Sequence, residues 1–249
     1  MAVLHLLGTG SAFADASRTT TMLAFESEGR TLVVDCGGDV IQRLLVSGVD
    51  LAGIEGMIVT HEHADHVGGF PLFMEKLWLS GRRDPIPVYG IEPAIDQARR
   101  GWEAFDTRSW KGVPEIQWHR VEHAPGAEVL RSERWHVTAS PGIHPVPVVG
   151  IRVEAAGGGV VAYSCDTDPS PEITKLATAA DILVHEGQKQ STPGVHSTYE
   201  QAADVALRCG ARRLVLVHLP PGVSDDDLAD ARKIFERTEL GHDGARYAF

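Results

Sequence analysis

The sequence predicts an α+β fold, a four-layer αββα sandwich formed by a single domain over residues 1–249. Patterns typical of strands and helices alternate at both ends of the chain. Residues 115–163 instead contain several short strand-like runs separated by glycine and proline, which predict an antiparallel meander. Each sheet needs a further layer to cover its apolar face. We therefore expect two β-rich halves packed face to face, with helices outside and no internal linker.

The N-terminal half is expected to supply one sheet and its helices. Short β-branched runs that end at polar or glycine-rich turns indicate buried strands. Apolar residues at helical spacing that stop at glycine or serine indicate helices. These criteria place strands at residues 3–7, 21–26, 31–35, 56–60 and 86–89, and helices at residues 39–47, 70–79 and 93–105.

The C-terminal half returns to alternation after the strand-rich middle. A strand that ends the middle region is followed by helices and strands in turn, as expected for a sheet covered on one face. We place strands at residues 160–165, 181–185 and 213–218, and helices at residues 171–179, 198–209 and 225–237.

The composition is that of an ordinary globular protein, with 43% hydrophobic and 23% charged residues. The formal net charge is −11. Since sequence-independent attraction to phosphates comes from lysine and arginine, nucleic acid is not the favoured partner. Three scattered cysteines argue against a disulfide framework. Neither a signal peptide nor an apolar run of about 18 residues is found, so we expect a cytoplasmic protein with no membrane partner.

The run from His61 to His66 concentrates metal-binding side chains directly after a buried strand. His61 and His63 lie two residues apart, so an extended chain would turn both imidazoles to the same side. Asp65 and His66 follow where the chain enters a double glycine, and they would face a second position beside the first. Imidazole and carboxylate are the ligands of hydrolytic zinc, and manganese or iron would also accept them.

One short run cannot complete two metal positions, so other strand ends must supply further ligands. His144 follows a Pro-Gly-Ile turn, Asp166 follows the strand at 160–165, and His218 ends the last predicted strand before Leu-Pro-Pro. Such loops gather functional residues because a rigid sheet holds them in register. Asp166 has two carboxylate oxygens and could bridge two ions about 3.5–4 Å apart.

These residues resemble the pattern of the metallo-β-lactamase superfamily. His-x-His-x-Asp-His at 61–66, with the earlier Asp35 and the later His144, Asp166 and His218, agrees with that family in order and spacing over nearly the whole chain. Other segments are similar to the ribonuclease Z-like branch. They are Leu-Gly-Thr-Gly-Ser-Ala at 7–12 with Arg18, Ser-Cys-Asp-Thr at 164–167, and His-Glu at 185–186 with His-Ser-Thr at 196–198.

The resemblance implies a metallo-β-lactamase-like sandwich that holds two divalent metal ions, zinc by expectation, and it also implies a homodimer. The ligands implied for one ion are His61, His63 and His144, those for the other are Asp65, His66 and His218, and Asp166 lies between them.

Four residues are expected to act around these ligands. Two dications would lower the pKa of a shared water, and Asp65 could accept a hydrogen bond from the resulting hydroxide. The resemblance implies that Asp35 steadies a ligand histidine. It also implies that His196, oriented by Glu186, gives a proton to the leaving group.

Several neighbouring residues are expected to be structural. Alternation along their strands should turn Cys36 and Cys165 away from the adjacent aspartates and into the core, so neither is counted as a ligand. His5 is expected to pack within the first strand, and His185 to support the site without binding metal.

The sequence departs from the ribonuclease Z pattern in two respects. That family carries a long, basic, glycine-rich arm between the third histidine and the bridging aspartate, and the arm holds tRNA. Residues 144–166 leave room only for strand, turn and strand. The chain also continues His185-Glu186 with Gly-Gln where the family has Ala-Thr, and His218 with Leu-Pro-Pro where the family favours Phe-Ser.

With the acidic net charge, these departures favour a binuclear metal-dependent phosphodiesterase that attacks a small or nucleotide-type substrate with a metal-bound hydroxide. Three alternatives stay open. They are a tRNA 3′ processing endoribonuclease, a lactone or carboxylic-ester hydrolase on the same metals, and a non-catalytic metal-binding protein.

Overall fold

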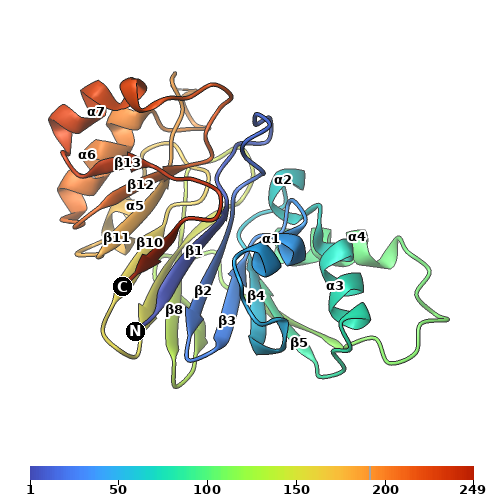
Figure 1. The fold of residues 1–249 in the computed structure, drawn as a ribbon. Helices are drawn as coiled ribbons and strands as arrows, with labels where there is room; N and C mark the ends of the chain where they lie inside the picture. The colour runs from blue at the N-terminus through green and yellow to red at the C-terminus, as the bar shows by residue number, and fades with distance from the viewer. Residues whose placement is uncertain (191) are drawn as a thin grey trace.

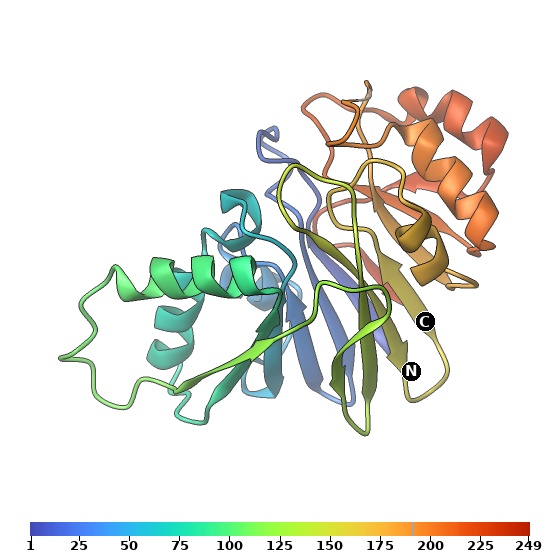
Figure 2. The same cartoon turned by 180° about the vertical axis from the view of Figure 1, so that it is seen from behind.

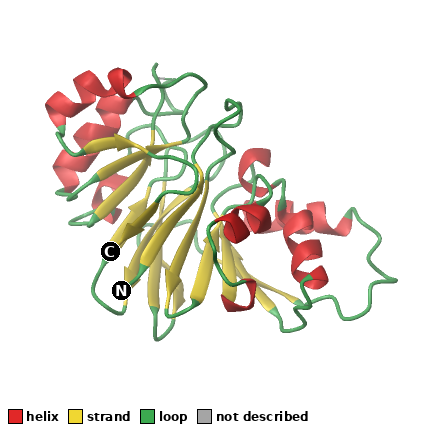
Figure 3. Cartoon of the chain, viewed as in Figure 1, coloured by secondary structure: helices red, strands yellow, loops and turns green. Residues whose placement is uncertain are grey.

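The computed structural model describes residues 1–190 and 192–249 and contains two seven-stranded sheets with helices on their outer sides (Figure 1). Seen from behind in Figure 2, α3 and α4 lie on the outer side of one sheet, and α5, α6 and α7 lie on that of the other. The colouring by secondary structure in Figure 3 shows the sheets between the two helical layers. The predicted αββα sandwich is therefore confirmed.

The first sheet has the strand order β14-β1-β2-β3-β4-β5-β6. Strands β14 to β3 pair antiparallel along the sheet, and β3 to β6 pair parallel. The strands are β1 (Val3–Gly8), β2 (Met22–Ser27), β3 (Arg30–Val34), β4 (Ile54–Val59), β5 (Ile86–Gly90), β6 (Ile116–Arg120) and β14 (Arg246–Ala248). Its helical segments are α1 (Val40–Val46), η1 (Leu51–Gly53), α2 (Ala64–Val67), α3 (Phe70–Leu79) and α4 (Glu92–Glu103).

The second sheet has the order β13-β12-β11-β10-β9-β8-β7. Strands β7 to β10 pair antiparallel, and β10 to β13 pair parallel. The strands are β7 (Ala127–Arg131), β8 (Trp135–Pro141), β9 (Val149–Ala155), β10 (Val160–Tyr163), β11 (Ile182–Glu186), β12 (Leu214–Val217) and β13 (Thr238–Leu240). Its helical segments are α5 (Pro171–Leu176), α6 (Tyr199–Cys209), η2 (Asp225–Leu228) and α7 (Ala229–Ile234).

The main core lies between the two sheets. Phe25 of β2 packs edge-to-face against Trp135 of β8, with ring centroids 6.5 Å apart, and both side chains are buried. Such aromatic pairs contribute about 0.5–1.5 kcal/mol beyond the burial of their surface. The core thus fixes the two sheets against each other and, with them, the loops at their strand ends.

Most predicted elements agree with the structure, and two do not. Helix α3 has the predicted bounds, and α6 begins with a capping box in which Thr198 and Gln201 exchange hydrogen bonds. The helix predicted at 225–237 is wrong in its extent, because it divides into η2 and α7 and the chain then turns into β13. Within the predicted antiparallel middle, β6 instead joins the first sheet, parallel to β5. None of the helices in the described residues is long and apolar enough to cross a membrane.

Candidate metal centre

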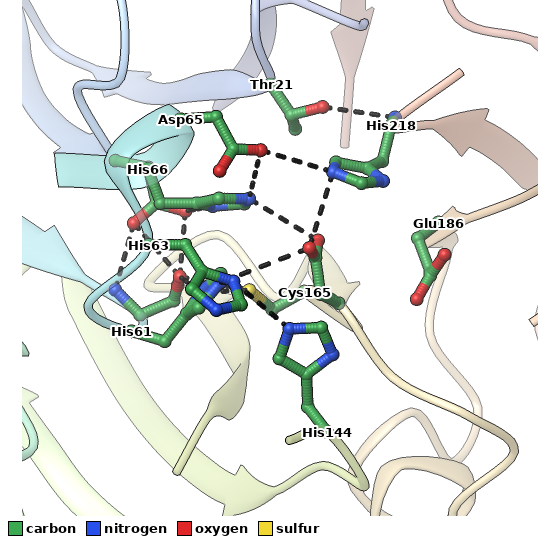
Figure 4. A network of polar contacts seen from close by, with 12 residues as sticks. Thr21, His61, His63, Asp65, His66, His144, Cys165, Glu186 and His218 are labelled. Atoms are coloured by element: carbon green, nitrogen blue, oxygen red, sulfur yellow. Dashed lines mark hydrogen bonds and ion pairs between the residues drawn. The ribbon is translucent and has the colours of Figure 1, made fainter. Parts of the chain in front are cut away.

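The candidate metal-binding side chains meet at one edge of the sandwich, where strands of both sheets end (Figure 4). The run 61–66 follows β4, and His63 precedes the short helix α2 with extended backbone. His144 lies in the loop between β8 and β9, Asp166 follows β10, and His218 follows β12. The predicted residues are therefore brought together from four separate places in the chain.

The first group of nitrogen atoms converges on one point. His63 Nδ1 lies 3.1 Å from His61 Nε2 and 3.2 Å from His144 Nε2. Two nitrogens on a tetrahedral zinc ion with bonds of about 2.0–2.1 Å lie about 3.3 Å apart. Asp166 Oδ2 is 4.0 Å from His61 Nε2. Together, these four side chains form a group able to hold a metal ion.

The second group shares Asp166 with the first. Asp65 Oδ2 lies 3.6 Å from His66 Nε2 and 3.4 Å from His218 Nε2. The oxygens of Asp166 lie 3.4 Å from His66 Nε2 and 3.3 Å from His218 Nε2. These distances also suit ligands of one ion, and Asp166 belongs to both groups.

Two buried polar atoms in this cluster lack a hydrogen-bond partner. Among the described residues, His66 Nε2 and Asp166 Oδ1 make no hydrogen bond, although neither is exposed to solvent. A buried polar atom without a partner carries a free-energy penalty of about 1–3 kcal/mol. A divalent cation would satisfy both atoms at once, so the residues present fit metal ions.

Each group of ligands is supported by polar contacts behind it. Asp35 accepts hydrogen bonds from His66 Nδ1 (2.8 Å) and from the backbone and hydroxyl of Thr60 (2.9–3.0 Å). His144 Nδ1 donates to the Val195 carbonyl at 2.9 Å, and the Gln188 amide lies 3.2 Å from His218 Nδ1. Such contacts fix the ring orientation and leave the opposite nitrogen for metal.

Some of these supporting residues were not predicted. Thr60 precedes His61 at the end of a predicted strand, which was a usable signal for a supporting hydroxyl. Nothing in the local sequence marks Gln188 or the Val195 carbonyl, because their contacts arise only when distant loops are folded together.

Backbone strain is concentrated at this edge. Asp35, Cys165 and His218 have φ angles of 60°, 53° and 54°, in the left-handed region that non-glycine residues rarely adopt. Each such residue costs on the order of 1 kcal/mol and persists only when its surroundings require it. All three lie in or beside the metal groups. The strained backbone therefore helps to direct these side chains.

Cys165 is buried in the core as expected, but the expectation that its side chain turns away from the site is wrong. Its sulfur is buried and lies 3.0 Å from the Thr60 hydroxyl and 3.5 Å from His61 Nδ1. Alternation fails because the left-handed φ of Cys165 interrupts the extended geometry that alternation assumes. The thiol therefore supports His61 from behind. Both Cys36 and Cys165 are buried in the core, as predicted, but Cys165 also contacts the site.

A close backbone approach holds the run 61–66 against the first sheet. The Cys36 N–H donates to the His66 carbonyl at 2.7 Å, which fixes α2 over the loop after β3. A Cβ added at Gly37 would lie 1.7 Å from the Asp65 carbonyl oxygen. Only glycine fits at this position, and it allows Asp35 to reach His66.

His196 stands at the border of the cluster with Glu186 behind it. Its Nδ1 lies 3.0 Å from both Glu186 carboxylate oxygens, and its ring stacks on that of His218 at 5.1 Å between centroids. Glu186 is fully buried and also accepts a 2.5 Å hydrogen bond from the Thr167 N–H. Glu186 therefore lies where it can hold the His196 ring by Nδ1. His185 points elsewhere, and its Nδ1 contacts the Glu186 carbonyl at 2.8 Å.

The charges in the cluster depend strongly on one another. Burial lowers the pKa of His61 well below its usual value, and nearby His66 lowers it further. Burial also opposes a charge on His66, but Asp166 and Asp35 outweigh it and hold the His66 pKa well above usual. Burial raises the pKa of Asp65, yet its hydrogen bond with His218 and nearby positive charge bring it to about 2. Positive charge from the neighbouring histidines also holds the pKa of Asp166 well below its usual value, although burial opposes this.

A surface cavity of about 460 Å³ opens beside the cluster. His196 and His218 lie in its wall, and the rest is lined by residues of three loops. These are Ser11, Ala12, Phe13, Gln188, Lys189, Gln190, Thr192, Pro220 and Pro221. The volume is in the range of small-molecule sites, about 300–1,000 Å³.

Comparison with known proteins identifies the family. A family model described as a β-lactamase superfamily domain matches residues 30–219. The chain is 31% identical to the ribonuclease Z of Mycolicibacterium gilvum over 274 aligned residues, which cover 98% of this chain and 94% of the relative. This chain belongs to the metallo-β-lactamase superfamily. Within the superfamily it is a ribonuclease Z-like protein, and it is a metal-dependent hydrolase.

Solved structures of this superfamily share the fold. The metallo-β-lactamase fold protein YhfI from Bacillus subtilis matches with a TM-score of 0.83 and 23% identity, covering 99% of this chain and 98% of that one. Human tRNase Z, short form, matches with a TM-score of 0.80 and 23% identity, covering 100% and 99%. The sandwich and its order of elements are therefore those of the metallo-β-lactamase fold.

Proposed function

We propose that this hydrolase cleaves a phosphodiester in a small or nucleotide-type substrate, with two divalent ions, zinc by preference, held by the two groups that share Asp166. The observation that carries the proposal is the pair formed by His196 and Glu186 beside those groups. An alkoxide that leaves phosphorus needs a proton, and a histidine positioned by a carboxylate can supply it.

The chain's own residues have separable tasks in this proposal. When bound, two dications would lower the pKa of a shared water and offset the negative charge that gathers on the attacked group. Asp65 accepts a hydrogen bond from the attacking water. Glu186 holds His196 by Nδ1, which leaves Nε2 to give the proton to the leaving oxygen. Burial and the charge of Asp166 raise the pKa of Glu186.

The region between His144 and Asp166 supports a small substrate. It is filled by β9, a short turn and β10, which pair with each other over Val160–Tyr163. The resemblance to ribonuclease Z places the tRNA-binding arm in this region, and no such segment is present in it. The cavity beside His196 is large enough for a nucleotide-sized ligand.

A second candidate is 3′ processing of tRNA. It is favoured by a specific finding, because relatives named ribonuclease Z align with 98% of this chain. Under this alternative, surfaces other than the arm would hold the tRNA, and binding would weaken steeply with salt.

The decisive experiment compares two leaving groups in the same enzyme. Bis(p-nitrophenyl) phosphate releases p-nitrophenolate, which departs without a proton, whereas a dinucleoside monophosphate releases an alkoxide. With zinc or manganese, we expect His196→Ala to slow dinucleotide cleavage by about 10²–10⁴-fold, the usual contribution of a general acid. Cleavage of the aryl ester should fall much less, and metal content should not change.

His136→Ala is the matched control, since His136 lies on β8 and contacts Glu154, outside the metal groups. Equal loss on both phosphodiesters, or loss of metal with His196→Ala, would contradict the proposed proton donor. Lactone turnover that is insensitive to His196→Ala, without phosphodiester turnover, would favour the ester hydrolase. Cleavage of precursor tRNA in preference to dinucleotides would favour the second candidate. Full metal content with no turnover would favour a metal-binding protein.

A further inference from the structure

The most exposed phenylalanine of the chain lies in the loop between β1 and β2. Phe13 is 81% exposed to solvent. The structure describes all seven phenylalanines, and Phe105 is the only other exposed one, at 59%. A single exposed apolar side chain is common on protein surfaces, so exposure alone assigns no role to Phe13. Its role has to follow from where the loop holds it.

Hydrogen bonds tie the base of this loop to the end of β12. The Leu219 N–H donates to the Thr9 carbonyl at 3.0 Å, and the Ser11 N–H donates to the Leu219 carbonyl at 3.0 Å. Leu219 directly follows the candidate ligand His218. Since consecutive Cα atoms are 3.8 Å apart, the Cα atom of Phe13 lies within about 8 Å of that of Ser11. Figure 1 shows the loop projecting beyond β1 and β2 on the same side as α2, where the metal groups lie.

The tip of the loop is held by further hydrogen bonds. The Ser11 hydroxyl donates to the Phe13 carbonyl at 3.0 Å. Beyond the tip, one oxygen of Asp15 accepts a hydrogen bond from the Ser17 N–H at 2.9 Å, and the other accepts one from the Gly222 N–H at 3.2 Å. Gly222 belongs to the segment that follows β12, so both limbs of the loop are fastened to that segment. The backbone therefore holds Phe13 in an exposed position.

Phe13 lines the cavity that opens beside the metal groups. The same cavity, of about 460 Å³, has His196 and His218 in its wall, and Pro220 and Pro221 add apolar surface to it. One cavity thus joins an exposed aromatic ring to the candidate proton donor and to a candidate metal ligand.

The polar groups of this cavity are largely engaged within the protein. Among the described residues that line it, Lys189 is the one lysine or arginine. Its ammonium group pairs with Asp227 at 2.9 Å. The Gln188 amide donates to the His218 carbonyl at 2.8 Å. A second phosphate would find no unmatched lysine or arginine among these residues, whereas a flat neutral group would find the face of Phe13.

The reaction proposed above determines which part of a substrate enters the cavity. His196 gives its proton to the leaving oxygen, so the leaving group lies on the His196 side of the attacked phosphorus. His196 borders the cavity that Phe13 also lines. The group attached to the leaving oxygen therefore extends into the cavity.

We propose that the Phe13 ring stacks on the nucleobase of a nucleoside leaving group. The inference rests on the proposed phosphodiesterase reaction, because that reaction places the leaving group in the cavity. Stacking on an aromatic side chain is favourable for every nucleobase, since each has a π face. Phe13 thus selects nucleoside leaving groups over those without a ring, with little discrimination among bases.

Kinetics with two matched substrates on the zinc-loaded protein test the proposal. One is the dinucleoside monophosphate ApA, and the other carries a ribose without a base in place of the leaving nucleoside. The position of the phosphate in the AMP product identifies which nucleoside leaves. Wild-type KM should be at least about fivefold lower for ApA than for the analogue. Phe13→Ala should raise KM for ApA to that of the analogue with kcat nearly unchanged, as expected when uniform binding is lost.

Three further variants separate stacking from other effects. Phe105→Ala is the matched control, because it removes the other exposed phenylalanine, which lies outside the cavity, and its KM should equal that of the wild type. Phe13→Trp keeps a flat ring and should retain the preference for ApA. Phe13→Leu keeps apolar bulk without a ring face and should behave like Phe13→Ala. Wild-type KM in Phe13→Leu would show that bulk suffices and would overturn the stacking site.

Calorimetric titration with AMP and with ribose 5-phosphate needs no turnover. The metal-loaded wild type should bind AMP at least about fivefold more tightly than ribose 5-phosphate, and Phe13→Ala should bind the two equally. A preference for AMP that depends on Phe13, in a protein without phosphodiester turnover, would contradict the proposed reaction and leave the stacking site in place. Phosphodiester turnover without any difference between wild type and Phe13→Ala, in KM or in binding, would overturn the stacking site alone.

Discussion

The two halves of the molecule contribute to the metal centre in different ways. The N-terminal half supplies four candidate ligands from the consecutive residues 61–66, held by α2 and by one carboxylate, Asp35. The C-terminal half supplies His144, Asp166 and His218 from three separate loops. The first set is arranged locally, whereas the second depends on the register of a whole sheet. We therefore expect metal affinity to be most sensitive to substitution of the residue that both groups share.

Asp166 is the meeting point, and its replacement should have the largest effect. Asp166→Asn keeps the shape but removes the charge that both groups share. We expect turnover to fall by at least about 10³-fold, as when a member of an interdependent catalytic unit is lost. Metal bound per chain, measured by inductively coupled plasma mass spectrometry, should fall for both positions.

Asp65→Asn tests the second metal position without the first. Asp204→Asn, on the exposed side of α6, is the control for the loss of one negative charge. Asp65 belongs only to the second group, so its loss should leave one ion per chain in place. Two ions retained in Asp166→Asn would show that Asp166 does not join the groups.

Asp35→Asn tests the N-terminal set alone and should have the next largest effect. The carboxylate accepts hydrogen bonds from Thr60 and from His66, and an amide can accept at only one oxygen. We expect about 10–100-fold weaker metal binding, the usual cost of losing a partner of a ligand histidine. Competition with a chromophoric chelator measures this affinity.

Gln188→Ala is the corresponding change in the C-terminal half. The neutral Gln188 amide lies near His218 Nδ1, so its removal should cost less than that of a buried carboxylate. If Gln188→Ala weakened metal binding more than Asp35→Asn, the half assembled from separate loops would depend on its supporting contacts more than the local run does.

Each sheet also holds a buried histidine outside the metal groups, and these differ in pH dependence. Burial lowers the pKa of His185 to about 4, and within the part of the chain that the structure describes only a backbone carbonyl opposes this shift. Between pH 6.5 and 4, the unfolded chain binds a proton there that the folded chain excludes. The contribution of neutral His185 to the free energy of unfolding is therefore complete above pH 6.5. It decreases by about 3 kcal/mol as the pH falls to 4. For His5, burial lowers the pKa too, but Glu26 opposes that shift.

Urea unfolding between pH 7.5 and 4.5, with a chelator present in every sample, checks this difference. His185→Leu cannot take up a proton, so its stability should decline less steeply with acid than that of the wild type, whatever its stability at pH 7.5. His5→Leu should alter the slope less. Parallel pH curves for wild type and His185→Leu would show that His185 is protonated in the folded protein.

The difference between local patterns and contacts between distant segments explains how much of the fold and the site the sequence could predict. Buried strands and helices showed clear patterns, so the sandwich and most element positions could be predicted. β13 and β14 could not, because each has three residues and their pairing joins distant parts of the chain. Within the site, the run 61–66 is a local pattern. His144, Asp166 and His218 were found as strand ends, but their distribution over two ions came from family resemblance.

Cys165 shows where pattern reasoning failed, and its replacement should have the smallest effect. Its thiol contacts Thr60 and His61 and belongs to neither of the two groups that share Asp166, so Cys165→Ala should weaken metal binding by less than the roughly 10–100-fold expected of a charged partner. Cys165→Gly loses the same contacts but relieves the left-handed φ of 53°. Strain of this kind costs on the order of 1 kcal/mol, so the glycine variant should unfold at higher urea than the alanine variant. If the two variants have equal stability and wild-type metal affinity, the backbone at Cys165 is unstrained and the thiol does not support His61.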